Sequence, residues 1–260
     1  MDIYYDKKYK KNALVRVFVR VDFENYLPDE VVVSESIEAV ARKYFPNRQM
    51  EQVVKLKDQN ASVVNDADGN SYESQYAEGV QREYRSENEK NKVVISNKYL
   101  VFEIGDYDTF TDLSLSYLPF LKSIFENSDA ITQRIGIRYV NVFNSSVIKP
   151  KKRFFNTKVA ETVTPQGLGP GGDIELVRSY NITEYQIDEM SLAFRHGLYN
   201  PDYPNVLTDK SFTLDFDCYT SEGINNWESV YEKLSKGHNS IEKLFEYVIT
   251  DDLRRVFYGE

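Results

Sequence analysis

The stretch Arg134-Ile-Gly-Ile-Arg-Tyr-Val-Asn-Val-Phe143 decides the fold of this chain. In an extended strand, Ile135 and every second residue after it fall on one face, while Arg134, Gly136 and Arg138 fall on the other. Most of its positions hold β-branched or aromatic residues, which favour strands. The sequence therefore predicts a central strand here, closing the first half of the molecule.

Other segments alternate in the same way. Ala13–Phe23 has one apolar face and a second face that carries Arg16 and Arg20. Ser211–Tyr219 has an apolar face that includes Cys218 and a second face with two aspartates. The remaining expected strands are Gln52–Lys57, Ser62–Val64, Val80–Arg85, Lys92–Ser96, Tyr99–Ile104, Ile174–Glu184 and Met190–Tyr199.

Apolar residues at helical spacing predict several amphipathic helices. They are Ser34–Tyr44, a segment from Asp108 to Phe125, Asn226–Lys236 and His238–Phe257. Pro119 predicts a kink or break near Tyr117 within the second of these. Gly237 is expected to separate the last two.

A basic segment with a proline, Lys149–Arg153, marks the clearest joint in the chain and divides residues 1–148 from 149–260. Each side has a strand with acidic residues, followed at once by a helix rich in Leu and Phe. We therefore expect an α+β protein of two packed halves in one compact unit, each a largely antiparallel sheet covered by helices. Their similar order suggests an internal duplication.

Composition narrows the classes of function. The 20 Tyr and 15 Phe favour a sheet-rich fold. A formal net charge of −9 disfavours nucleic-acid binding, which depends on Lys and Arg, although a local basic groove stays open as an alternative. The single cysteine fits a reducing compartment. The first twelve residues are charged, and no apolar run reaches the ~18 residues of a membrane helix, so we expect a cytoplasmic protein without membrane contact.

The most distinctive polar cluster is Arg134 and Arg138, which flank Gly136 on one strand face. The missing side chain leaves room between two guanidinium groups, a geometry suited to an anion or carboxylate. Arg16 and Arg20 are added as anion-binding candidates. An internal ion pair with acidic neighbours would give the same sequence pattern, so both interpretations stay open.

A second candidate is a metal site at Asp215 and Asp217. Both carboxylates project from one strand face, about 7 Å apart at ~3.3 Å per residue. Oxygen ligands in this arrangement suit Mg²⁺ or Mn²⁺. The alternative is an ordinary polar face of an antiparallel strand, and the leading interpretation needs no cofactor.

Other reactive side chains are few. Two histidines and one cysteine leave a zinc site short of ligands. Cys218 lies on an apolar strand face, which argues against a nucleophilic thiol. We expect His238, at the start of the last helix, to have a structural role in a helix-terminal or buried polar contact.

Two stretches resemble a known protein family. They are Arg134-Ile-Gly-Ile-Arg-Tyr-Val-Asn141 and a C-terminal pattern of His238, Ile241, Phe245, Thr250, Leu253 and Phe257. These resemble the TIGR04255 family of sporadically distributed bacterial and archaeal proteins, whose pattern the Leu214–Asp217 strand also matches. The resemblance covers nearly the whole chain. It implies a prokaryotic accessory role in phage defence, a toxin–antitoxin module or a mobile element, and it carries over no catalytic residues.

The leading expectation is therefore a non-enzymatic interaction protein, which binds a protein partner or associates with itself. One alternative is a metal-dependent phosphoesterase or nuclease that uses Asp215 and Asp217. Another is an RNA-binding protein with ferredoxin-like halves, using the arginines, Lys151–Arg153 and the glycine-rich loop Gly167–Gly172.

Overall fold

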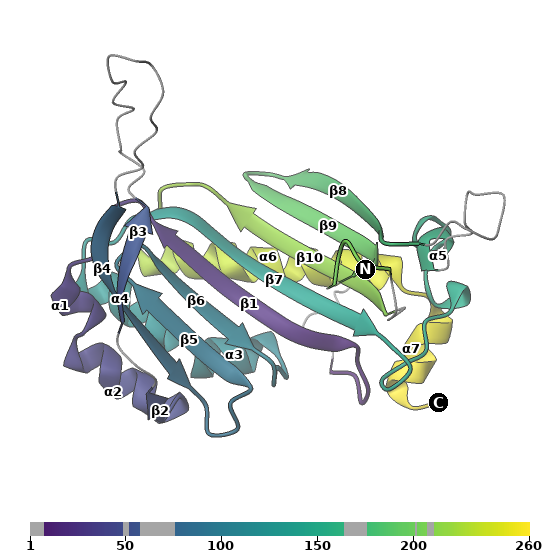
Figure 1. Ribbon diagram of the computed structural model, residues 1–260, viewed down its shortest axis with the longest axis horizontal. Helices are drawn as coiled ribbons and strands as arrows, with labels where there is room; N and C mark the ends of the chain where they lie inside the picture. Colours follow the sequence, from purple (N-terminus) through teal and green to yellow (C-terminus); the bar gives the residue numbers. More distant parts are fainter. Residues whose placement is uncertain (1–7, 49–51, 58–75, 164–175, 201, 207–210) are drawn as a thin grey trace, which may run out of the picture.

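The fold is a ten-stranded antiparallel sheet with helices packed against one face (Figure 1). The computed structural model describes residues 8–48, 52–57, 76–163, 176–200, 202–206 and 211–260. The strand order is β2-β4-β5-β6-β1-β7-β10-β9-β8, and β3 pairs with β4. The strands are β1 Leu14–Phe23, β2 Asn47–Arg48, β3 Gln52–Lys57, β4 Tyr76–Arg85, β5 Asn91–Ser96, β6 Tyr99–Ile104, β7 Thr132–Phe143, β8 Ser179–Ile187, β9 Met190–Leu198 and β10 Phe212–Thr220.

In Figure 1, helices pass behind the middle of the sheet and others lie beside its two ends, while the other face of the sheet is turned toward the viewer. We call the uncovered side the open face. The helices are α1 Asp29–Val32, α2 Glu35–Tyr44, α3 Phe110–Ser116, α4 Leu118–Asn127, α5 Thr157–Val163, α6 Trp227–Val248 and α7 Asp251–Tyr258, with a 3₁₀ turn η1 at Lys152–Phe154. Ser34 caps α2 as its sequence position suggests, since its Oγ accepts a hydrogen bond from the backbone N–H of Ile37 at 3.3 Å.

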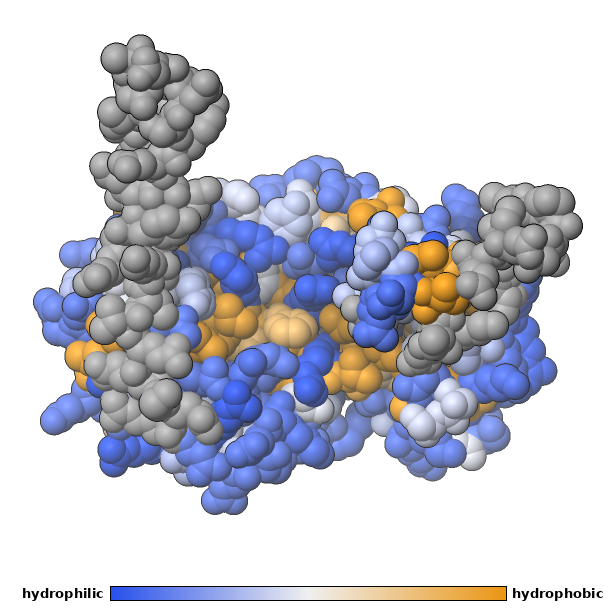
Figure 2. All heavy atoms as spheres, in the orientation of Figure 1, coloured by the Kyte–Doolittle hydropathy of each residue, from blue (hydrophilic) through white to orange (hydrophobic). Residues whose placement is uncertain are grey.

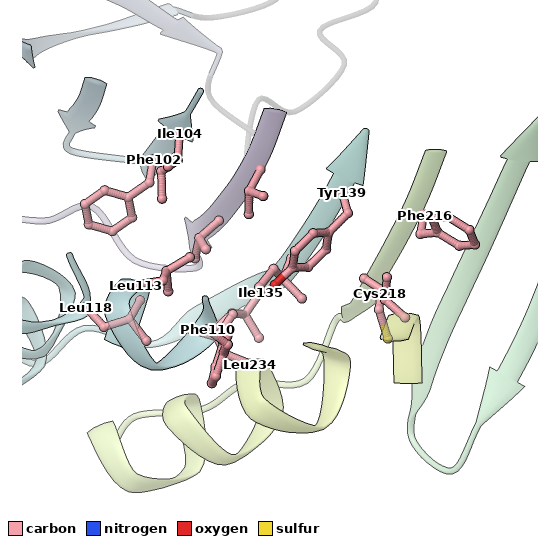
Figure 3. Close-up of a cluster of buried hydrophobic side chains, with 14 of the residues drawn as sticks. Phe102, Ile104, Phe110, Leu113, Leu118, Ile135, Tyr139, Phe216, Cys218 and Leu234 are labelled. Atoms are coloured by element: carbon pink, nitrogen blue, oxygen red, sulfur yellow. The ribbon is translucent and has the colours of Figure 1, made fainter. Parts of the chain in front are cut away.

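The core lies between the sheet and the helices. Alternate residues of β1 and β7, such as Val19 and Ile137, are almost completely buried there. Figure 3 shows side chains from β6, β7 and β10 directed toward α3, α4 and α6. The alternation read from the sequence therefore assigns the faces of these strands correctly.

The class α+β is confirmed, and the strands of both halves join in one sheet. β7 and β10 pair from Phe212↔Phe143 to Thr220↔Ile135, so the two strand sets meet edge to edge. One hydrophobic cluster includes residues from both sets. Residue 148, where the sequence suggests a joint, lies between β7 and η1.

Two parts of the chain repeat one topology. In 14–127 and again in 132–248, a central strand is followed by one or more helices, then by three successive antiparallel strands (β4–β6 and β8–β10), and then by one or more helices. The first part has β2 and β3 in addition, before β4. The order outward from the centre is β1-β6-β5-β4 on one side and β7-β10-β9-β8 on the other. The repeats meet at the antiparallel pair of β1 and β7.

The repeat also shows in the sequence at this pair. Arg16-Val-Phe-Val-Arg20 aligns with Arg134-Ile-Gly-Ile-Arg138. In this alignment Val19 is equivalent to Ile137, and these two residues lie opposite each other in the sheet. A local two-fold axis therefore passes between them, perpendicular to the sheet.

Two helix boundaries differ from the sequence prediction. The expected break at Gly237 is wrong, because α6 runs unbroken through this residue and ends at Val248. The expected single helix His238–Phe257 is also wrong, because Ile249 and Thr250 are extended and α7 begins at Asp251. A Cβ at Gly237 would lie 3.0 Å from Cγ2 of Ile137, so glycine allows the helix to approach the sheet closely. Among the described residues no helix is long and apolar enough to cross a membrane.

The predicted break near Tyr117 is confirmed. α3 ends at Ser116 and α4 starts at Leu118, with Pro119 in its first turn, where a missing N–H costs nothing. The sequence segment was expected to start at Asp108, but α3 starts at Phe110 and Thr109 is its cap, since Oγ1 of Thr109 accepts a hydrogen bond from the N–H of Asp112 at 3.0 Å.

Candidate functional site

The four candidate arginines lie on the open face, around the local two-fold axis. Arg16 and Arg20 come from β1, and Arg134 and Arg138 come from β7. Their neighbours in each strand, such as Val19, point into the core, so alternation turns the arginines away from the helices. The structure thus brings together residues that are far apart in the sequence.

A groove of about 530 Å³ runs across this face. Three of the four arginines line it, and Arg16 does not. Its lining residues are Phe18, Arg20, Asp22, Val101, Arg134, Gly136, Arg138 and Asp217. Figure 2 shows apolar side chains in the middle of this face, between hydrophilic ones. We call this hollow the arginine groove.

Arg138 pairs with a deeply buried aspartate of the sheet. Its Nε and Nη2 donate to the two carboxylate oxygens of Asp215, both at 2.7 Å. Asp215 is 1% exposed, whereas the side chain of Arg138 is 43% exposed. The hydrogen bond to Asp215 raises the pKa of Arg138, although partial burial acts in the opposite direction. This pair is a fixed part of the groove wall.

Arg134 and Arg195 complete an ionic network around the second aspartate. Nη2 of Arg134 donates to Asp217 at 3.2 Å, and its guanidinium lies 4.5 Å from the ring centroid of Tyr219. Arg195 of β9 lies 3.5 Å from Asp215 and 3.7 Å from Asp217. Both aspartates are therefore engaged by guanidinium groups.

Arg20 pairs with an aspartate that is more accessible than Asp215. Its Nη2 and Nε donate to Asp22 at 2.6 Å and 2.9 Å, and its guanidinium lies 5.3 Å from the ring centroid of Tyr99. Roughly half of the Arg20 side chain is exposed. Arg16, outside the groove, donates to Glu103 at 3.0 Å.

Gly136 shapes the groove directly opposite Arg20. The two residues face each other across the β1–β7 pair, so the missing side chain leaves space beside the guanidinium. A Cβ at Gly136 would lie 2.9 Å from Cβ of Tyr219 and 3.1 Å from the carbonyl oxygen of Cys218. This position therefore requires glycine because β10 approaches closely.

The geometry does not suit a metal ion at Asp215 and Asp217. Both oxygens of Asp215 already accept hydrogen bonds from Arg138, and a cation there would meet two guanidinium groups. No cluster of three or more His, Cys, Asp or Glu side chains that would hold a metal occurs among the residues that the structure describes. The carboxylates act as partners for arginines.

The chemistry that remains open in the groove is anion binding. Within the described part of the chain, Arg20 and Arg138 each place Nε and Nη2 on an aspartate, which leaves Nη1 for a ligand. Three arginines and two aspartates line the groove, and Arg195 and Asp215 lie directly beside them, so this cluster has one cationic group more than anionic groups although the chain is acidic. Phe18 and Val101 add apolar contact area.

Sequence reasoning missed four residues of this site, Phe18, Asp22, Val101 and Arg195. Phe18 and Asp22 lie on the same strand face as Arg20, so alternation was a usable signal. Arg195 is the single Lys, Arg, Asp or Glu in the expected strand Met190–Tyr199, but its place beside Asp215 depends on strand pairing.

His238 and Cys218 lie on the helix side of the sheet. His238 sits inside α6, so its expected position at a helix start is wrong. The Tyr139 hydroxyl lies 2.9 Å from Nδ1 of His238, and the imidazole stacks on Phe110 with 4.5 Å between ring centroids. Burial raises the pKa of the Cys218 thiol to about 12, which keeps it protonated.

The basic residues of the expected joint lie away from the groove. Arg153 is 3.6 Å from Asp252 of α7, and none of Lys151–Arg153 lines the groove. The loop Gly167–Gly172, the strand Ser62–Val64 and part of the strand Ile174–Glu184 lie outside the described residues. The sequence-predicted basic surface is therefore reduced to the arginines of the open face.

Comparison of the chain with models of known protein families and with curated proteins finds no match. The arginine groove is therefore the feature from which a function is inferred.

Proposed function

We propose that the protein is a binding protein whose arginine groove takes an acidic segment of a partner protein. The observation that carries this proposal is a groove lined by Arg20, Arg134 and Arg138 on a sheet face that the described helices leave uncovered. Guanidinium groups bind carboxylates through two parallel hydrogen bonds, which gives both affinity and orientation.

The dimensions and lining of the groove suit a peptide segment. Its volume of about 530 Å³ holds a few side chains. Phe18 and Val101 offer an apolar floor for the neighbours of an acidic residue. Arginine with aromatic residues is typical of the energetically dominant part of a protein interface.

A protein ligand fits the charge pattern better than a nucleic acid. Asp22 and Asp217 alternate with the arginines, and Glu103 lies on the same face. A continuous row of phosphates would meet these carboxylates, and the chain carries a net charge of −9. Spaced carboxylates on a peptide avoid this repulsion.

The test compares partner capture by the native chain and by an Arg20→Glu variant. Arg20 is chosen because its carboxylate partner, Asp22, is not deeply buried, so the variant is expected to fold. Arg42→Glu on α2 is the matched control, since its side chain is 71% exposed and lies outside the groove. We expect a partner retained by the native chain and by Arg42→Glu to be lost with Arg20→Glu. Equal capture by all three chains would overturn the proposal.

RNA binding is the second candidate, because four arginines share one sheet face with Phe18, Tyr99 and Tyr219. Aromatic side chains on a sheet stack bases in several RNA-binding folds. Titration of a labelled single-stranded RNA at increasing salt distinguishes the two. Affinity that falls steeply with salt and is lost in Arg20→Glu would favour RNA over an acidic peptide.

A further inference from the structure

Strand β8 forms one edge of the sheet. It pairs with β9 over all nine residues, from Ser179↔Leu198 to Ile187↔Met190, and in the described part of the chain no strand lies on its other side. Figure 1 shows β8 along the upper border of the sheet. Its outward backbone N–H and C=O groups are therefore available to a further strand.

In the first repeat, the equivalent edge is paired with other strands of the same chain. β4 occupies the position equivalent to β8, and its outer side pairs with β3 from Gln52↔Gln81 to Lys57↔Tyr76 and with β2 beyond that. The chain thus covers one end of its sheet with its own strands. At the other end, the equivalent edge is open among the described residues.

The side chains of β8 do not protect the edge from pairing. Natural edge strands carry lysine, proline or bulges that prevent pairing with another chain. β8 reads Ser-Tyr-Asn-Ile-Thr-Glu-Tyr-Gln-Ile, without lysine or proline, and its register with β9 is regular. Ile182 is 61% exposed and Tyr185 is 44% exposed, on opposite faces of the sheet. Both faces of the edge therefore offer apolar surface.

The sequence of β8 is complementary to itself in the antiparallel direction. When two copies are centred on Ile182, the isoleucines face each other, Asn181 faces Thr183 and Tyr180 faces Glu184. Glu184 is the one charged residue of the strand, so this register places no like charges opposite each other. Tyrosine hydroxyl and carboxylate are matched as donor and acceptor.

We propose that β8 binds β8 of a second copy of this chain, antiparallel and with Ile182 at the two-fold axis. The sheet then continues from one subunit into the other. Because the axis is perpendicular to the sheet, the open faces and their arginine grooves lie on the same side of the dimer. This inference goes beyond the proposed ligand and does not depend on it, since β8 does not line the groove.

The first measurement is the molar mass of the full chain by light scattering across a range of concentrations. We expect a dimer for the native chain and a monomer for Ile182→Lys, which places two ammonium groups opposite each other at the axis. Leu115→Lys is the matched control, because Leu115 is 67% exposed on α3 and is not part of the edge. This control is expected to remain dimeric with an unchanged circular dichroism spectrum.

A cysteine pair tests the register. Directly opposite residues in antiparallel strands bring their Cβ atoms to roughly 5 Å, close enough for a disulfide after a small adjustment. Ile182→Cys is therefore expected to form a covalent dimer under mild oxidation, whereas Thr183→Cys is not. The native Cys218 is buried and does not compete.

Two results would overturn the proposal. One is a native chain that stays monomeric at all concentrations, which leaves the edge to a different protein. The other is a dimer that persists in Ile182→Lys, which places the interface elsewhere. Loss of partner capture in Arg20→Glu has no bearing on either result, so the two proposals are tested separately.

Discussion

Removal of the Arg138 guanidinium should destabilise the protein more than removal of the carboxylate that it binds. In Arg138→Gln, the buried Asp215 loses two hydrogen bonds of 2.7 Å and, among the residues that the structure describes, keeps only the longer contact with Arg195. Breaking a buried ion pair from one side costs about 3–5 kcal/mol. Arg195 and water that enters where Arg138 is 43% exposed reduce this, so we expect a loss of about 2–3 kcal/mol.

The reverse substitution has a smaller effect. In Asp215→Asn, the half-exposed guanidinium of Arg138 is hydrated, and one amide oxygen still accepts a hydrogen bond. We expect a loss of about 1–2 kcal/mol, the cost of a weakened charge-assisted hydrogen bond. The asymmetry follows from burial, since Asp215 is nearly inaccessible and Arg138 is not.

Urea unfolding of both variants and the double variant measures these free energies and the coupling between the residues. Lys122→Gln is the control, because its pair with Glu126 is exposed and worth less than about 1 kcal/mol. Equal losses below about 0.5 kcal/mol in the Arg138 and Asp215 variants would refute the reasoning, because surface changes have effects of that size. So would a larger loss in Asp215→Asn.

Three further predictions also concern the stability of the folded protein. Gly237→Leu should lower the free energy of unfolding by about 1–3 kcal/mol, because its side chain would press against Ile137; a stabilised variant would contradict close packing at this position. Burial lowers the pKa of His196, so the unfolded state binds more protons below about pH 6.5 and stability should fall as the pH drops from about 7 toward 5. His196→Gln should show a shallower fall over this range, and an unchanged slope would exclude His196 as the cause. Addition of Mg²⁺ or Mn²⁺ should leave the melting temperature unchanged, because arginines engage both aspartates; a rise that Asp215→Ala abolishes would support the phosphoesterase alternative.

Strands were predictable from the sequence where one face is buried. The alternation in Leu14–Phe23 and Thr132–Phe143 is a local property, because successive side chains of a strand point to opposite faces. It correctly placed the arginines on one face of each strand. The break at Tyr117 was also local, since Pro119 starts a new helix.

Features that depend on strand pairing were not predictable. The position of Arg195 beside Asp215 requires the β9–β10 register, which no single strand specifies. The helix break expected at Gly237 is wrong for a related reason. Glycine within a helical pattern indicates either a break or a close contact, and only the position of Ile137 decides between them.

The arginine groove differs on the two sides of the local two-fold axis, because equivalent positions of the two repeats hold different residues. Under the repeat, Arg20 is equivalent to Arg138, and Tyr99 is equivalent to Asp215. Arg138 therefore donates hydrogen bonds to the buried carboxylate of Asp215. Arg20 instead lies over the neutral ring of Tyr99 and pairs with the more accessible Asp22. A ligand carboxylate that binds Arg138 in place of Asp215 leaves the buried carboxylate of Asp215 unpaired, which is energetically costly. Competition for Arg20 displaces a partly hydrated aspartate, which is cheaper. An acidic ligand should therefore bind on the Arg20 side, where the glycine of the second repeat has left the space.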